Sequence, residues 1–263
     1  MTRTIRPAED IAADAISRRN LLGRLALVGA GGIVATAIPT SSLFAAGAAP
    51  SPGSILDRGF APPLPAMNTP ADALRELADG NRRFAEGKPV GPNRSMARLK
   101  DIAPKQAPFA AVLACADSRV PVEILFDQGF GDVFVCRAAG NIVTPEMLAS
   151  LEFGTLVLGA KALIVLGHSS CGAVKATIAG DAVPGQISTL YQHIQPAVER
   201  VAAQSKDVNA KPELEAVAHE NVRIQARLLS RSSPVLGGLV KEGKLAIVGG
   251  MYDLTSGRVA MLG

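Results

Sequence analysis

The chain has 263 residues, of which 48% are apolar and 19% are charged. A chain of this size can bury one substantial hydrophobic core, so we expect a single enzyme-sized domain. Lys and Arg outnumber Asp and Glu by only 27 to 23, no basic run is present, and tryptophan is absent. Because so small a surplus provides no electrostatic footprint for a polyanion, we expect no nucleic-acid partner.

Residues 1–48 are predicted to be an export signal of the twin-arginine type. Arg18 and Arg19 directly precede residues 21–37, a run that is mostly apolar but is interrupted by Arg24 and diluted by glycines. A membrane-spanning helix needs about 20 predominantly apolar residues, so removal is favoured over anchorage. Small residues then provide sites for a signal peptidase. We expect a periplasmic or secreted protein without a stable membrane anchor; an uncleaved anchor or a misread gene start is the alternative.

Residues 49–67 are rich in Pro, Ala, Gly and Ser and contain no periodic apolar positions. This composition is typical of a linker. The folded domain is therefore expected over residues 68–263.

A helix is predicted at the start of this domain, over residues 69–84. Thr69 is a suitable N-cap, and Pro70 is compatible with the first helical turn. Gly80 and Asn81 are expected to interrupt this helix.

Three short apolar runs follow, and each suits a buried strand. They cover residues 109–115, 133–136 and 162–167. Residues 145–158 are too long for a strand and rich in helix formers, so they fit a helical crossover between parallel strands. The order predicted so far is β-α-β-α-β.

The remainder predicts further helices and two closing strands. The helices are expected from residue 172, over 187–203 and over 212–231, and the strands over 245–248 and 259–262 with a turn at 253–257. The whole pattern predicts an α/β fold, a mainly parallel central β-sheet flanked by helices with an antiparallel edge strand. Ligand sites on such sheets lie beyond the carboxyl ends of the strands.

Two cysteines and a histidine fall at those strand ends. Cys115 closes the first strand, and His168 with Cys171 lies just past the third. The spacing His-x-x-Cys allows an imidazole and a thiolate to reach one ion, and Cys115 would be the third ligand. Soft thiolates with an imidazole select zinc, and three protein ligands leave a fourth position open, as in catalytic sites.

The residues beside these ligands resemble the two signature motifs of β-class carbonic anhydrases. The first is Cys115-Ala116-Asp117-Ser118-Arg119, and the second is His168-Ser169-Ser170-Cys171-Gly172-Ala173. The resemblance extends from about residue 73 to the C-terminus and leaves out only the signal and the linker. It implies a zinc enzyme that hydrates carbon dioxide reversibly to bicarbonate and a proton.

The resemblance also implies roles for individual residues. Cys115, His168 and Cys171 would bind one Zn²⁺ per chain. Asp117 and Arg119 would be the catalytic pair, while Gln106, Phe134 and Gly172 would be substrate-binding residues. Phe134 would face the site of a neighbouring subunit, because the family implies a homodimer or a dimer of dimers.

The formal charge of the predicted zinc site explains why a nearby carboxylate would assist the metal. Zn²⁺ with two thiolates and a neutral imidazole is formally neutral, so it lowers the pKa of a bound water less than a site with three neutral ligands does. Asp117 could orient the nucleophile toward carbon dioxide, with Arg119 holding its carboxylate ionised. The resemblance leaves open whether Asp117 pairs with Arg119 or itself occupies the fourth zinc position.

The remaining candidate ligands are assigned structural roles. Cys136 lies on the second predicted strand without metal spacing, so a buried free thiol is expected. His193 and His219 lie on helical patterns and are expected to be surface or packing histidines.

Two alternative functions remain open from the sequence. A carbon disulfide or carbonyl sulfide hydrolase could use the same ligands on the same scaffold. A non-enzymatic zinc-binding or redox-sensing domain is more remote, because a structural zinc site would usually have a fourth protein ligand.

Overall fold

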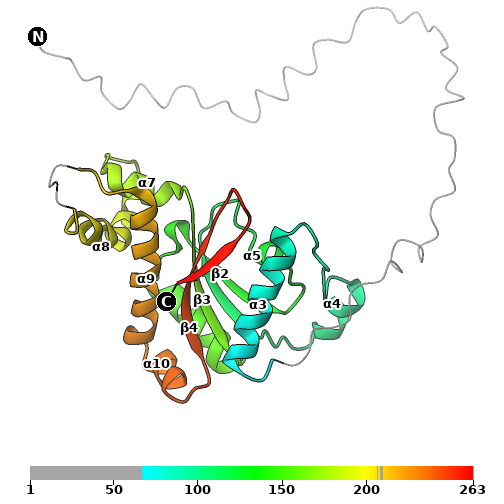
Figure 1. The fold of residues 1–263 in the computed structure, drawn as a ribbon. Coiled ribbons are helices and arrows are strands. Elements are labelled where there is room, and N and C mark those ends of the chain that lie inside the picture. Colours follow the sequence, from blue (N-terminus) through cyan, green and yellow to red (C-terminus); the bar gives the residue numbers. More distant parts are fainter. Residues whose placement is uncertain (1–66, 206, 208–209, 263) are drawn as a thin grey trace, which may run out of the picture. The chain divides into compact units, whose positions relative to one another are not determined.

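The computed structural model describes residues 67–205, 207 and 210–262 (Figure 1). The predicted signal and all of the predicted linker except Met67 lie outside these residues. Within the described ranges, no helix combines the length and the apolar character required to cross a membrane.

A five-stranded sheet forms the centre of the domain, in the order β2-β1-β3-β4-β5. The strands are β1 (Ala110–Ala114), β2 (Val133–Arg137), β3 (Ala162–His168), β4 (Ala246–Tyr252) and β5 (Val259–Leu262). The first four strands pair in parallel, and β5 pairs antiparallel with β4. The predicted fold class, including the antiparallel edge strand, is therefore confirmed.

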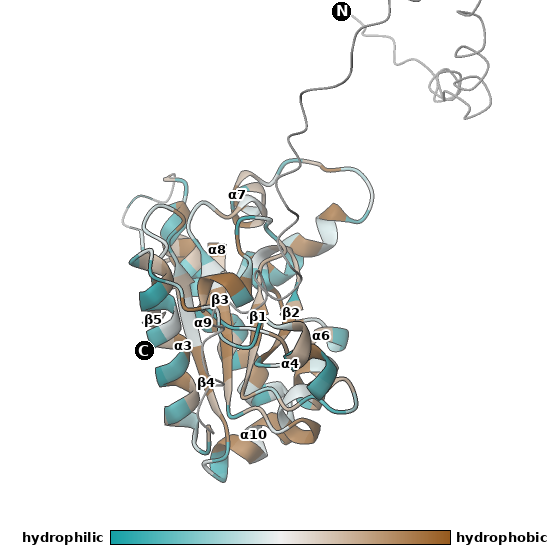
Figure 2. Ribbon diagram, turned by 90° about the vertical axis from the view of Figure 1, so that its right-hand side faces the viewer, coloured by the Kyte–Doolittle hydropathy of each residue, from teal (hydrophilic) through white to brown (hydrophobic). Residues whose placement is uncertain are grey.

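Helices cover both faces of this sheet. The elements in chain order are α3 (Pro70–Ala85), α4 (Met96–Ile102), α5 (Val122–Leu125), η2 (Ala139–Asn141), α6 (Pro145–Glu152), η3 (Phe153–Val157), α7 (Gly172–Ala179), η4 (Ile187–Leu190), α8 (Tyr191–Ala202), α9 (Leu214–Ser232) and α10 (Pro234–Lys241). Buried side chains of α6 to α10 pack on one face, and those of α3 and α5 pack on the other. Figure 2 shows the apolar strands between these layers.

The central strands are apolar because both of their faces are covered. Every residue of β1 and β3 is buried. Alternate residues of β1 serve the two cores: Ala111 and Leu113 contact the α9 side, while Val112 contacts the α3 side. This two-sided burial explains why these strands are continuous apolar runs in the sequence, without alternation.

The expected interruption of the first helix at Gly80 and Asn81 is wrong, since α3 runs unbroken from Pro70 to Ala85. Gly80 allows close packing, because a Cβ there would lie 1.9 Å from the carbonyl oxygen of Phe126. Asn81 is buried and its amide donates to the carbonyl oxygens of Leu125 and Gly257, each at 3.0 Å. Tertiary contacts thus compensate for the low helix propensity of both residues.

Two short helices were not predicted, α4 and α10, whereas α5 lies in the helical stretch expected between the first two strands. The strand boundaries also shift slightly, because β1 ends at Ala114 and His168 is the last residue of β3. Ala114 pairs in register with Leu166 of the neighbouring strand β3. The segments that leave β1 and β3 therefore emerge side by side at one edge of the sheet.

Candidate metal centre and catalytic site

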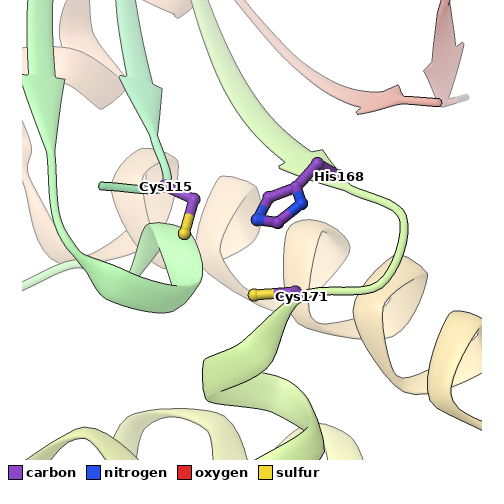
Figure 3. A group of neighbouring side chains, drawn as sticks. All are labelled: Cys115, His168 and Cys171. Atoms are coloured by element: carbon purple, nitrogen blue, oxygen red, sulfur yellow. The ribbon is translucent and has the colours of Figure 1, made fainter. Parts of the chain in front are cut away.

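Three buried side chains meet at the carboxyl ends of β1 and β3. The ligand atoms of Cys115, His168 and Cys171 all lie within 4.8 Å of one another. Figure 3 shows the two sulfur atoms and the imidazole ring directed toward a common point. The structure therefore brings together the three predicted metal ligands.

The imidazole of His168 has one nitrogen, Nε2, available to bind a metal ion. Its Nδ1 lies 2.9 Å from the backbone oxygen of Ser169. A carbonyl oxygen can only accept, so Nδ1 carries the hydrogen and Nε2 keeps a free lone pair. Nε2 is buried and has no hydrogen-bond partner. An orphaned acceptor between two sulfur atoms fits a metal ion, and its donor set favours zinc.

The pKa values of the two neighbouring thiols are shifted in opposite directions. The hydrogen bond from Cys171 lowers the pKa of Cys115, with a further contribution from His168. The same hydrogen bond, together with burial, raises the pKa of Cys171. Both sulfurs would bind a metal ion as thiolates, so metal binding would release protons from this pair.

Asp117 and Arg119 form a bidentate ion pair beside the three predicted ligands. Arg119 donates from Nε to Oδ1 of Asp117 at 2.9 Å and from Nη2 to Oδ2 at 2.8 Å. The side-chain hydrogen bond from Arg119 holds the pKa of Asp117 well below its ordinary value. Oδ2 lies 3.8 Å from Nε2 of His168, so an ionised oxygen faces the metal position while remaining paired with Arg119.

Arg137 is a site residue that the sequence analysis did not single out. From the last position of β2, it donates to the backbone oxygen of Cys115 at 3.0 Å and to that of Asp117 at 2.5 Å. It therefore ties the loop that carries Cys115 and Asp117 to the neighbouring strand. Nothing in its spacing indicates this, because the contact depends on the parallel pairing of β1 and β2.

The three predicted substrate-binding residues lie in different places. Gly172 begins α7 directly after Cys171, and a Cβ there would meet only open space. Phe134 pairs with Ala111, four residues before Cys115, so it lies about 13 Å away along the strand direction. Gln106 lies before β1 and lines a separate surface cavity of about 670 Å³ with Val157. One chain therefore brings neither Gln106 nor Phe134 to its own metal ligands.

The other candidate ligands lie outside the metal group. Cys136 is a buried free cysteine, and burial raises the pKa of its thiol. His193 and His219 are partly buried on α8 and α9. The described residues contain no second cluster of potential metal ligands, so the structural roles expected for these three residues agree with their positions.

Comparisons with known proteins converge on one family. The carbonic anhydrase family model matches residues 110–259. A carbonic anhydrase of Mycolicibacterium smegmatis is 38% identical over 74% of this chain and 94% of that protein, and one of Pseudomonas aeruginosa is 35% identical over 72% and 87%. The structure of a Coccomyxa β-carbonic anhydrase in complex with acetazolamide is 27% identical, with a TM-score of 0.57 over 72% of this chain and 86% of that one.

A comparison with a described assembly is also informative. The crystal structures of two tetrameric β-carbonic anhydrases from the ascomycete Sordaria macrospora include a chain that is 27% identical to this one. The TM-score is 0.57, and the match covers 63% of this chain and 85% of that one.

The ligand assignment predicts which cysteine substitution removes a bound metal. Cys171→Ser replaces a soft ligand and should reduce metal content from about one zinc per chain to nearly none. Cys136→Ser is the matched control, because it alters another buried free thiol that lies outside the ligand group, and it should leave the zinc in place. Elemental analysis of purified protein measures both, and equal zinc in the two variants would exclude the assigned centre.

Proposed function

Since this chain belongs to the β class of the carbonic anhydrase family and is an enzyme that hydrates carbon dioxide, we propose that it does so at one zinc ion held by Cys115, His168 and Cys171. The observation that carries this proposal is the buried group of two sulfurs and one unpaired nitrogen, with the carboxylate of Asp117 3.8 Å from that nitrogen. Three protein ligands would leave a bound zinc ion one further coordination position for water.

The metal ion, Asp117 and Arg119 would have separate roles in the reaction. A zinc ion held by the three ligands would supply a Lewis acid that activates water as a nucleophile toward carbon dioxide. Oδ2 of Asp117 is placed to accept a hydrogen bond from such a water and so to orient it toward carbon dioxide. Arg119 donates a hydrogen bond to each oxygen of Asp117, so the carboxylate stays ionised and remains an acceptor. The products are bicarbonate and a proton.

The alternatives left open by the sequence are not favoured. The curated relatives that match most of the chain are named carbonic anhydrases, which disfavours a sulfur-specific hydrolase. A purely structural zinc site would require a fourth ligand, and among the described residues the only metal-binding group has three.

Replacing Asp117 tests its role separately from metal binding. Asp117→Asn keeps the shape of the side chain but removes the charge that Arg119 pairs with, so zinc content should stay near one per chain while carbon dioxide hydration falls roughly 100-fold. Stopped-flow hydration and metal analysis on one sample measure both quantities. Asp181→Asn, at an exposed loop position, is the control and should match the unmodified protein. Unchanged hydration in Asp117→Asn would refute the catalytic assignment.

We further propose that the active protein is a homodimer or a dimer of dimers, in which Gln106 and Phe134 reach the site of a partner subunit. Phe134 lies on β2, an edge strand whose outer backbone groups have no partner strand in the described chain. Beside it, η3 exposes apolar side chains: Phe153 is 48%, Leu156 56% and Val157 63% exposed. A contiguous exposed apolar surface at a sheet edge favours association with another copy.

A hybrid assembly distinguishes a shared site from a self-contained one. Chains carrying Gln106→Ala and chains carrying Asp117→Asn are given different affinity tags, coexpressed, and purified for both tags. If Gln106 serves the partner, one of the two sites receives both substitutions and the other receives neither, so the hybrid regains about half of the unmodified activity. If Gln106 serves its own chain, every site has one defect and activity stays as low as in the parent variants.

We also propose that the chain is exported to the periplasm through the twin-arginine route. This proposal rests on Arg18 and Arg19 before the apolar run at residues 21–37. The chemistry of the site fits such a route, because Cys115 and Cys171 are close enough to be at risk of oxidation in an oxidising compartment. A folded protein that acquires zinc before export would carry these thiolates already protected.

The export proposal predicts a specific effect of the arginine pair. A variant with Arg18→Lys and Arg19→Lys keeps the positive charge but removes the pair, so it should accumulate in the cytoplasm. The control variant carries Arg3→Lys and Arg6→Lys, outside the pair, and should be exported normally. Immunoblots of periplasmic and cytoplasmic fractions report the outcome. Periplasmic accumulation of the first variant at the level of the control would exclude this route.

A further inference from the structure

Helix α9 contacts the segment that carries Gly140, next to Cys115, and the loop between His168 and Cys171, although none of its residues is a predicted ligand. We infer that Asn221 on this helix is a positioning residue for the thiolate of Cys115, and that it acts through the backbone of Gly140. This inference rests on the proposed zinc site and extends it to a part of the chain about 100 residues away in sequence from Cys115.

The first link joins Gly140 to the sulfur ligand. The backbone N–H of Gly140 donates to Sγ of Cys115 at 3.3 Å, within the buried interior. Gly140 has a φ of 75°, a left-handed conformation that favours glycine. A Cβ at this position would also lie 2.6 Å from Cδ1 of Ile194. Its backbone is thus placed close to the sulfur at a point where a side chain does not fit.

The second link joins Gly140 to α9. Nδ2 of Asn221 donates to the backbone oxygen of Gly140 at 2.9 Å, and Asn221 is only 1% exposed. The same residue that donates to the thiolate is therefore held through its carbonyl group by a buried side chain. Losing this contact would leave a buried carbonyl oxygen unpaired and free the loop to move.

The orientation of the Asn221 amide is itself determined. Its Oδ1 accepts from Nε2 of Gln225 at 3.2 Å, and that nitrogen also donates to the backbone oxygen of His193. Oε1 of Gln225 accepts from the backbone N–H of Val143 at 2.9 Å. Backbone groups have fixed donor and acceptor roles, so each amide in this network has one favourable orientation. Asn221 is thereby set to donate to Gly140.

This chain of hydrogen bonds has a direct consequence for metal binding. An N–H donor stabilises the ionised form of a sulfur ligand and restricts the directions in which its lone pairs point. Partners of this kind around metal ligands affect metal affinity by about 10- to 100-fold. Glu215, two turns earlier on α9, accepts from the backbone N–H of Ser170 at 2.8 Å, so the same helix also holds the loop between His168 and Cys171.

The test compares Asn221→Ala with Asn81→Ala. Asn81 is also a buried helical asparagine with three hydrogen bonds to backbone groups, but it lies on α3 and contacts no ligand loop. Both variants should lose stability to a similar degree. Only Asn221→Ala should bind zinc about 10- to 100-fold more weakly in competition with a chelator. With cobalt in place of zinc, its thiolate-to-metal charge-transfer band should shift, whereas the band of Asn81→Ala should not.

The zinc affinities of the variants and of the unmodified protein decide whether the inference holds. Equal zinc affinity in Asn221→Ala, Asn81→Ala and the unmodified protein would overturn it, even if stability falls. Unmodified protein that binds no zinc would instead refute the proposed function, so the two failures are distinguishable. If Asn221→Ala does not fold, Gln225→Met is measured instead. This variant removes the donor that orients Asn221, while the amide of Asn221 itself is kept. Weaker zinc binding in this variant supports the inference, and unchanged binding overturns it.

Discussion

The site depends on one constraint: the parallel strands β1 and β3 end side by side and bring polar metal-binding groups close together in the interior. The segments after β1 and β3 place two thiols and an imidazole within 4.8 Å of one another, away from water. The nitrogen that faces the sulfurs has no hydrogen-bond partner. Burying such groups is unfavourable without a compensating charge, and a soft divalent cation satisfies all three at once. The paired carboxylate of Asp117 and the hydrogen bonds made by helix α9 surround this group of three side chains.

The proposed catalytic pair, Asp117 and Arg119, depends on the same geometry. A zinc ion with two thiolates has little charge left to activate water, so a correctly placed acceptor is useful. The structure orients Asp117 with Arg119 instead of leaving it free to turn inward, and Arg137 holds the backbone of the same loop. Family membership establishes the reaction, and this local arrangement explains how the residues of the chain would support it.

Much of the fold and the site could be predicted because both depend on local sequence. Burial on two faces produces the continuous apolar runs of β1 and β3, and Cys115 with the His168–Cys171 spacing stands at their ends. The break expected in α3 was wrong because Gly80 and Asn81 are compensated by contacts with α5 and the β4–β5 turn, which propensity does not include. The helices α4 and α10 were missed because their short segments carry little periodic signal.

The sequence by itself predicted the types of the proposed ligands, their order and the proposed catalytic pair, since all of them lie in two short continuous motifs. Only the tertiary structure decided which distant groups support them. The hydrogen bonds from Arg137 and Asn221 and the one accepted by Glu215 join residues 20 to 81 positions apart, and their formation depends on strand pairing and helix packing. The tertiary structure likewise separated Gln106 from the metal ligands of its own chain, because the two ends of a strand lie at opposite edges of the sheet.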